Sequence, residues 1–284
     1  TRLELAQDLS MVTEGLSLKG VFSYDRNNFK QKEWYKSPYL YSKDANGDYI
    51  LKERSSPSLN MTTKEREALE YQAHLLYDRK FGDHSISGLV MAMAHTEKFT
   101  QLGGSRNSFD SDILDQMNAG NTTGQTLNGL DYRTARISYV GRINYNYMQK
   151  YLAEANIRRD GSENFAPDKR WGTFTSFSLG WVISEENFFE PLKDKINFLK
   201  LRGSYGTLGN DNTGGVSFPY YSRFDLYSTD QYQPNGAPQN MGDYIFGELV
   251  TKGLVPGPIA NKLATWEKST KTNIAVDFGL FDNF

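Results

Sequence analysis

The chain contains no cysteine, which excludes disulfide frameworks, thiol catalysis and cysteine-based metal sites. It has no run of about 18 apolar residues, which excludes a helical membrane protein. The formal net charge is −2, so no global basic field favours nucleic acid as a partner. Aromatic residues are abundant instead. The 18 tyrosines and 17 phenylalanines, against four tryptophans, are typical of a β-rich protein.

Alternating apolar and polar side chains predict nine β-strands, because successive side chains of a strand point to opposite faces. The clearest strand runs over residues 136–147, with Tyr139 and Ile143 on one face and Arg142 on the other. The other predicted strands cover residues 1–9, 16–26, 69–78, 84–98, 151–158, 172–183, 196–207 and 273–280. Each of these strands except 84–98, where the alternation is less regular, combines an apolar face with a more polar one.

The connections between these strands differ in length in a regular way. Short turns follow the first, third, fifth and seventh strands, whereas polar stretches at about 27–64, 100–130 and 209–264 follow the second, fourth and eighth. An outer-membrane β-barrel has this asymmetry, with short periplasmic turns and long external loops. Strands of roughly 9 to 11 residues suffice to cross a bilayer at a tilt. Because both ends of the sequence fall at strands, we expect a segment of something larger.

Several short motifs cluster in residues 158–210 and near the C-terminal end. They are Arg159-Asp160-Gly161-Ser162, Arg170-Trp171-Gly172, Ser178-Leu179-Gly180-Trp181, Ile183-Ser184-Glu185-Glu186, Leu199-Lys200-Leu201-Arg202, Ser204-Tyr205-Gly206, Trp266-Glu267-Lys268-Ser269 and Asp277-Phe278-Gly279-Leu280-Phe281. In order and spacing these motifs resemble the SusC/RagA-type TonB-dependent transporters of Bacteroidota outer membranes. The resemblance covers nearly all of the predicted strands but few loop positions.

The resemblance implies an all-β fold, an antiparallel up-and-down transmembrane β-barrel segment with about nine strands of a barrel of about 22. Residues 1–284 would then be a partial barrel domain without the plug domain, the TonB box and the terminal strands. The implied location is the bacterial outer membrane. There, such proteins actively import glycans, oligosaccharides or peptides.

The resemblance also implies the partners of the chain. These are a SusD-like surface lipoprotein, the TonB–ExbB–ExbD complex acting through N-terminal parts, the outer-membrane lipid and a glycan or peptide substrate, with no nucleic acid. We expect no enzymatic activity, no catalytic residues and no cofactor, since no GxSxG nucleophile motif occurs. Two alternatives stay open, a soluble β-rich glycan-binding module and a small self-contained porin or barrel enzyme.

Two sets of residues are candidate functional positions. The first set lies on the polar faces of predicted strands and is expected to face the lumen, where it would contact the plug or line the pathway: Arg136, Arg142, Glu154, Arg158, Lys200 and Arg202. The second set consists of loop aromatics that could contact substrate or lid: Phe218, Tyr220, Tyr221, Phe224, Tyr227 and Tyr232. General lumen polarity with neighbouring salt bridges, and packing within the loop, are the simpler explanations.

No metal site is predicted. The three histidines, His74, His84 and His95, show no metal-binding spacing, and we expect them in turns or facing the lumen. The acidic run from Asp44 to Asp48 departs from a calcium loop, because Gly47 stands at position four and Ser55 at position twelve. We therefore interpret that run as a turn.

The connection at 184–195 is predicted to be a periplasmic turn with one helical turn over 187–193. Ser184 would cap this helical turn, which makes the Glu185–Glu186 pair a structural feature rather than a pair of acids for catalysis. The strands on either side should present Trp181 and Leu201 to lipid. The polar segment from Asp160 to Arg170 should be a loop outside the cell.

Overall fold

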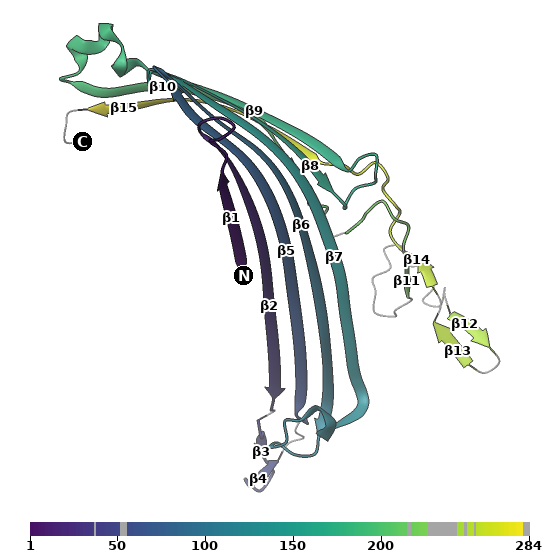
Figure 1. The fold of residues 1–284 in the computed structure, drawn as a ribbon. Helices are drawn as coiled ribbons and strands as arrows, with labels where there is room; N and C mark the ends of the chain where they lie inside the picture. The colour runs from purple at the N-terminus through teal and green to yellow at the C-terminus, as the bar shows by residue number, and fades with distance from the viewer. Residues whose placement is uncertain are drawn as a thin grey trace. The chain divides into compact units, whose positions relative to one another are not determined.

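The computed structural model describes residues 1–36, 38–51, 56–214, 217–226, 243–246, 249–252 and 254–280. Its main sheet contains β1 (Arg2–Asp8), β2 (Leu16–Tyr35), β5 (Ser58–Phe81), β6 (His84–Phe109), β7 (Gly120–Tyr147), β8 (Tyr151–Ser162), β9 (Trp171–Val182), β10 (Ile196–Asn210) and β15 (Glu267–Leu280) (Figure 1). The short elements are β3 (Tyr41–Lys43), β4 (Tyr49–Leu51), η1 (Met117–Ala119), η2 (Ile183–Glu185), η3 (Asn187–Leu192), β11 (Phe224–Leu226), β12 (Asp243–Phe246), β13 (Leu249–Lys252) and β14 (Leu254–Pro256). Within the described ranges, no helix has the length and apolar character needed to cross a membrane.

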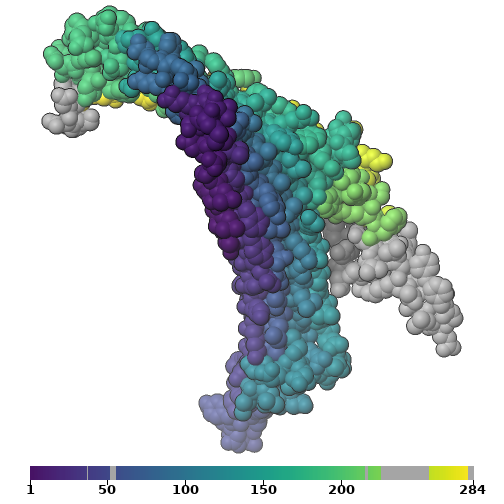
Figure 2. Space-filling model, viewed as in Figure 1, coloured from purple at the N-terminus to yellow at the C-terminus, as the bar shows by residue number. Residues whose placement is uncertain are grey.

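The nine long strands pair in the order β1-β2-β5-β6-β7-β8-β9-β10-β15. Each strand therefore lies beside its neighbour in the chain, apart from the small hairpins inserted between β2 and β5 and between β10 and β15. Where the register is given, from β7 to β10 and on to β15, every pairing is antiparallel. The predicted all-β, up-and-down arrangement of nine strands is confirmed. Figure 2 shows β1, in purple, along one edge of this sheet.

Four strands are much longer than the sequence pattern predicted. β2 and β5 extend into the polar stretch at 27–64 from both sides, and β6 and β7 run through most of the stretch at 100–130. The predicted long connections are therefore shorter, at residues 36–57 and 110–119, because the added strand segments have polar residues on both faces and do not alternate. Cross-strand contacts connect them instead. Lys64 Nζ lies 5.8 Å from the centre of the Phe29 ring, and the hydroxyls of Ser105 and Thr126 hydrogen-bond at 2.6 Å.

The connection before β9 is also shorter than predicted. β8 continues to Ser162, so Arg159, Asp160 and Gly161 lie in the strand and not in a loop. Their registers are regular, with Arg159 opposite Thr173 and Gly161 opposite Trp171. Only residues 163–170 remain as the connection between β8 and β9.

Two tight connections depend on unusual backbone angles. Gly15, with φ of 86°, accepts a hydrogen bond from the Asp78 amide at 2.9 Å, and a Cβ there would lie 1.9 Å from the Asp78 carbonyl oxygen. The β7–β8 turn has φ of 52° at Met148 and 60° at Gln149, as the hairpin turns of type I′ require. The Asn146 side chain accepts from the Gln149 amide at 2.8 Å and so supports this turn.

The chain divides into two compact units. The first consists of residues 1–5, 20–72 and 94–135, and the second of residues 6–19, 73–93 and 136–284. The second unit contains the only buried aromatic cluster among the described residues, formed by Phe165, Phe174 and Trp266. It also contains β8, β9, β10 and β15, and the candidate positions from the sequence all fall within its range.

Candidate functional site

In the second unit, the sheet has one polar and one apolar face. The polar face consists of Arg136, Ser138, Arg142, Asn144, Glu154, Asn156, Arg158, Ser176, Ser178, Lys200, Arg202, Ser204, Asn273 and Asp277. Cross-strand register aligns these residues in rows, one of which runs through Asn144, Glu154, Ser178, Ser204 and Asn273. The structure therefore places all six predicted polar-face residues on one side of one sheet.

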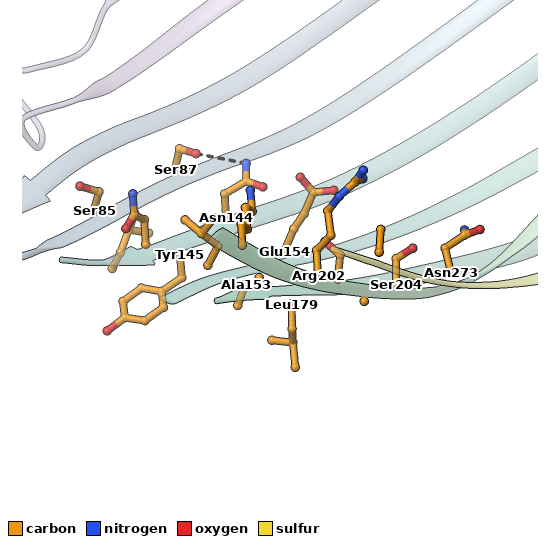
Figure 3. Close-up of a pocket in the computed structure, with 18 of the residues that line it drawn as sticks. Ser85, Ser87, Asn144, Tyr145, Ala153, Glu154, Leu179, Arg202, Ser204 and Asn273 are labelled. Atoms are coloured by element: carbon orange, nitrogen blue, oxygen red, sulfur yellow. Dashed lines mark hydrogen bonds between the residues drawn. The ribbon is translucent and has the colours of Figure 1, made fainter. Parts of the chain in front are cut away.

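A shallow hollow of about 590 Å³ lies over the middle of the polar face (Figure 3). Its lining combines two acidic residues, Asp78 and Glu154, with the cations Lys200 and Arg202 and with several hydroxyl and amide groups. Within it, the Asn144 side chain donates to the Ser87 hydroxyl at 3.2 Å. The hollow thus offers both hydrogen-bond donors and hydrogen-bond acceptors. It contains charges of both signs, and neither sign dominates.

Three arginines of the polar face are held by aspartates. Both oxygens of Asp211 accept from Arg136, at 2.8 and 2.9 Å, and both oxygens of Asp277 accept from Arg202, at 2.9 and 3.2 Å. Arg158 Nε contacts both carboxylate oxygens of Asp160, and its Nη2 donates to the Ser138 hydroxyl at 3.1 Å. Such two-point pairs fix the arginine planes as well as neutralising their charge.

The remaining candidates on this face are less constrained. Arg142 donates to the Asn156 side chain at 2.7 Å, and Asn156 in turn donates to Glu154 at 2.7 Å. Lys200 is half-buried beside Gly180 and has no carboxylate within ion-pair distance among the described residues. Arg142 and Lys200 are therefore the two cations of this set that have no carboxylate partner among the described residues and are available to a group approaching from outside the sheet.

The motif-bearing connection between β8 and β9 packs as a small core. Phe174 points from β9 toward Phe165 and Trp266, with its ring centroid 5.4 Å from that of Trp266. The indole of Trp266 donates to the Arg170 carbonyl at 2.9 Å. Glycine is needed at position 209, because a Cβ there would lie 1.9 Å from the Phe174 ring. We name the cluster of Phe165, Phe174 and Trp266 the loop core.

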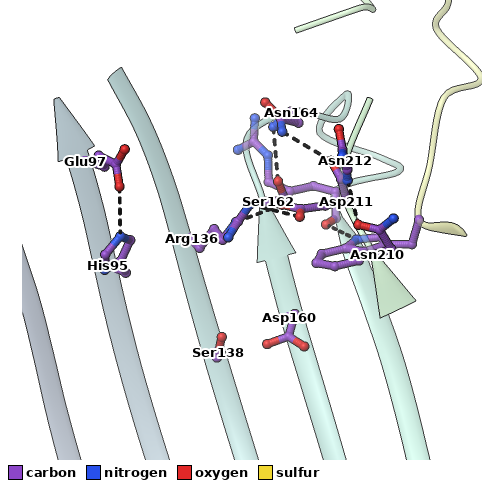
Figure 4. A network of polar contacts seen from close by, with 12 residues as sticks. His95, Glu97, Arg136, Ser138, Asp160, Ser162, Asn164, Asn210, Asp211 and Asn212 are labelled. Atoms are coloured by element: carbon purple, nitrogen blue, oxygen red, sulfur yellow. Dashed lines mark hydrogen bonds and ion pairs between the residues drawn. The ribbon is translucent and has the colours of Figure 1, made fainter. Parts of the chain in front are cut away.

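A polar network adjoins the loop core and is drawn in Figure 4. Asp211 accepts from Arg136 through its side chain and from Asn164 through its carbonyl, at 3.3 Å. The Asn210 side chain accepts from the Asn212 amide at 3.0 Å, which turns the chain after β10. This network holds the end of β10 against the β8–β9 connection.

The predicted loop aromatics are only partly described. Phe218 and Tyr220 are half-buried, whereas Tyr221 and Phe224 are exposed. The rings of Tyr220 and Tyr221 lie 4.3 Å apart, and burial raises the pKa of the Tyr220 hydroxyl. Tyr227 and Tyr232 lie outside the described residues. The described part therefore presents Tyr221, packed against Tyr220, and Phe224 as exposed aromatic surfaces.

Glu186 has a role that the sequence did not indicate. One of its oxygens accepts from the Tyr151 hydroxyl at 2.6 Å and from the Trp181 indole at 3.1 Å, and the other lies 3.3 Å from Lys150 Nζ. The predicted cap is wrong, since Ser184 lies inside η2 with a buried hydroxyl that has no partner among the described residues. The helical turn itself is confirmed as η3. The sequence signal that could have indicated the role of Glu186 is the pair Tyr151 and Trp181, which lie opposite each other at the turn ends of β8 and β9.

Glu186→Gln should weaken this turn in a pH-dependent manner. The hydrogen bonds from Tyr151, Trp181 and Lys150 lower the pKa of Glu186, so its contribution is complete above the unfolded-state pKa and is lost as pH falls through the folded pKa. We expect the variant to melt a few degrees below wild type at pH 7 and to converge with it toward pH 3. Thermal melts across that range measure this, with the exposed neighbour Glu185→Gln as control. A constant difference at all pH values would contradict the assignment.

The structure shows no metal-binding arrangement in its described parts. No group of three or more histidine, cysteine or acidic residues there could hold a metal ion. In the first unit, His95 lies 3.4 Å from Glu70 and 4.0 Å from Glu97, and His84 in the second contacts the Tyr145 hydroxyl at 2.7 Å. The Asp44 side chain accepts from the amides of Asn46 and Asp48, which makes that segment the turn between β3 and β4.

Sequence comparison finds bacterial receptors over large parts of the chain. A TonB-dependent receptor of Formosa agariphila is 31% identical over 207 residues, which are 72% of this chain and 18% of the relative. The TonB-dependent receptor SusC of Bacteroides thetaiotaomicron is 36% identical over 150 residues, or 53% of this chain and 14% of the relative. A second receptor of Formosa agariphila is 26% identical over 95% of this chain and 24% of its own length. No protein-family model matches the chain.

Structure comparison finds the same fold in solved transporters. The structure of the RagAB peptide transporter superposes with a TM-score of 0.73 at 19% identity, covering 95% of this chain and 27% of that one. The RagAB peptide importer in its open-open state gives a TM-score of 0.76 at 18% identity over 99% of this chain and 28% of that one. The chain thus spans well under a third of the length of each of these proteins.

Proposed function

We propose, from the premise that this chain is a barrel segment of the SusC/RagA type of TonB-dependent receptor, that it forms part of the wall of an outer-membrane importer. The receptor would take up glycans, oligosaccharides or peptides and draw energy through TonB. The chain would supply strands of the wall and several connections on the cell surface. It would have no enzymatic role.

The observation that carries this proposal is the exposed apolar face of the second unit. It consists of Ile137, Tyr139, Ile143, Tyr145, Tyr151, Ile157, Trp171, Phe177, Leu179, Trp181, Leu201, Tyr205, Ile274, Val276 and Phe278, almost all of which are exposed. A soluble protein seldom exposes so large a continuous apolar surface. Lipid is the environment in which such a face is stable.

The distance between the tryptophans at the two ends of β9 matches the height of a lipid-facing apolar band. Trp171 and Trp181 lie on the same side of the strand, ten residues apart. That is about 34 Å along a strand, or roughly 24 Å across a bilayer at a tilt of about 45°. The apolar band of an outer-membrane barrel is about 25 Å tall and carries aromatic residues at both borders. Trp171 stacks on Tyr139, and Trp181 lies opposite Tyr151, as members of two such belts.

With the apolar face toward lipid, the polar face would line the lumen. Arg136, Arg142, Glu154, Arg158, Lys200 and Arg202 would then contact the plug or the passing cargo. The arginines bound to aspartates would stiffen the wall, and Lys200 would meet the cargo or the plug directly. Tyr221 and Phe224, exposed after β10, would offer aromatic surface to a sugar ring or to a SusD-like lid.

Lys200→Gln should leave assembly unchanged and slow uptake by about tenfold, the effect of losing one charge-assisted hydrogen bond. The readouts are the amount of heat-modifiable protein in the outer membrane and the initial rate of uptake. Lys195→Gln, at an exposed turn position, is the matched control. Normal uptake by the Lys200 variant would show that this residue does not face the transport path.

The function itself is tested by deleting the gene and following two labelled cargoes, an oligosaccharide mixture and a peptide mixture. Loss of uptake of one of them, restored by the wild-type gene, supports the proposal and selects the substrate class. Unchanged uptake of both, together with recovery of the protein from the soluble fraction, would instead favour a soluble glycan-binding module.

A further inference from the structure

The turn between β9 and β10 contains a short 3-10 helix with three distinct sides. In a 3-10 helix residues three apart share a side. The three sides of η3 therefore pair Asn187 with Glu190, Phe188 with Pro191, and Phe189 with Leu192. The first side is polar and the other two are apolar, in a turn whose exposed positions would ordinarily all be polar.

The two apolar sides of η3 differ in how far they are buried. Phe189 is 3% exposed and fastens the helix to the protein, whereas its neighbour Phe188 is 65% exposed. Pro191 is exposed beside Phe188, and Leu192 is 48% exposed. Asn187 and Glu190 are also exposed, on the polar side. The helix thus offers one apolar and one polar surface to its surroundings.

The exposed apolar side is continuous with the apolar face of the sheet. The Phe188 ring makes an edge contact with Trp181, at a centroid distance of 6.4 Å, and Trp181 is the last residue of that face on β9. Glu186, just before η3, accepts hydrogen bonds from both Trp181 and Tyr151. These contacts fix the orientation of η3 beside the aromatic belt that contains Trp181 and Tyr151.

We propose that η3 is an interfacial anchor, which inserts Phe188 and Pro191 into the boundary between lipid headgroups and acyl chains while Asn187 and Glu190 face water. The partner is the phospholipid leaflet at the turn end of the strands. This inference rests on the proposed function, because it needs the apolar sheet face to be in lipid. The gain comes from removing the exposed Phe188 ring from water, in the manner of amphipathic helices that lie in the plane of the interface.

Site-directed spin labels test the anchor in the receptor as the cell makes it, reconstituted in phospholipid vesicles. The absence of cysteine from these residues allows single labels at Phe188→Cys, Glu190→Cys and Leu201→Cys, with any cysteine elsewhere in the polypeptide replaced by serine. Power saturation then compares collisions with oxygen, which concentrates in lipid, and with a water-soluble nickel chelate. We expect the label at 188 to favour oxygen at least several-fold more than the label at 190, and the label at 201, on the apolar sheet face, to favour oxygen as well.

The three labels separate the two claims. If 201 reports lipid while 188 and 190 both report water, the anchor is wrong and the membrane wall stands. If 201 also reports water, the proposed function fails and the anchor fails with it. A Phe188→Ser variant provides a second measurement. It should fold normally in detergent, because Phe188 is exposed, and should lower the fraction of receptor inserted into vesicles.

Discussion

Phe177→Lys is expected to destabilise the membrane-inserted receptor by about 2–4 kcal/mol, the cost of a lysine at the midplane of a transmembrane barrel. Phe177 lies on β9 between the two border tryptophans, six residues from Trp171 and four from Trp181. Its side chain is 49% exposed on the apolar face, opposite Ala155 and Tyr205. The neighbours of Phe177 on this face are Ala155, Tyr205, Thr175 and Leu179, so no carboxylate lies beside it to pair with the new charge. Equilibrium unfolding by guanidinium from phospholipid vesicles measures the difference.

Two further lysine substitutions control for depth in the membrane and for the face of the sheet. Leu201→Lys, opposite Trp181 and so near the border, should cost at most about 1 kcal/mol, because the penalty falls toward the interface. Ser178→Lys, the next residue along β9, points to the polar face near Glu154 and should be nearly neutral. Equal effects at 177 and 178 would mean that the two faces do not meet different solvents, and the lipid assignment would fail.

Phe174→Ala should have the other large effect, about 3–5 kcal/mol, because it removes a buried ring from the loop core. Phe174 is 6% exposed and packs against Trp266, which also contacts Phe165. Its removal should release the β8–β9 connection from the segment that carries Trp266. Near-ultraviolet circular dichroism and tryptophan emission report that release, and unfolding measures its energy.

A pair of substitutions that exchange side-chain volume between positions 209 and 174 tests whether packing in the loop core causes the loss of stability. Gly209→Ala would put a methyl group 1.9 Å from the Phe174 ring, so it should cost about 1–3 kcal/mol by overpacking. Combining it with Phe174→Leu should recover part of that loss, since the smaller side chain leaves room for the methyl group. Simple additivity of the two changes would show that they do not share a cavity.

The sequence predicted the strands well wherever one face is apolar. Alternation located β8 to β10 and the part of β7 from Arg136 to Tyr147 within a few residues. Ile143, Phe177 and Leu201 must avoid water there, while Arg142 and Lys200 must reach it. The same rule placed the six polar candidates on one face. Salt bridges with neighbouring strands were the simpler explanation for these residues, but alternation could not name the partners, since Asp277 lies on another strand and Asp211 beyond the end of β10.

Alternation failed where both faces of a strand are polar. In β2 and β5 beyond Tyr24 and Glu67, the ladder continues through cross-strand pairs such as Arg26 with Glu65, which leave no periodic trace in either segment alone. Local composition there favours turns, and only the pairing of distant segments makes strands of them. Glu186 was missed for a related reason, because its three partners come from two strand ends and a turn.

The aspartate-bound arginines of the polar face have a consequence for electrostatics. Arg136, Arg158 and Arg202 each face a carboxylate at contact distance, so each pair acts at long range as a dipole and not as a charge. Beyond a Debye length of about 8 Å in physiological salt, little of their field remains. Such a wall would not concentrate ions of one sign ahead of it, and any molecule moving along it would be sorted at contact by hydrogen-bond geometry, with little dependence on ionic strength.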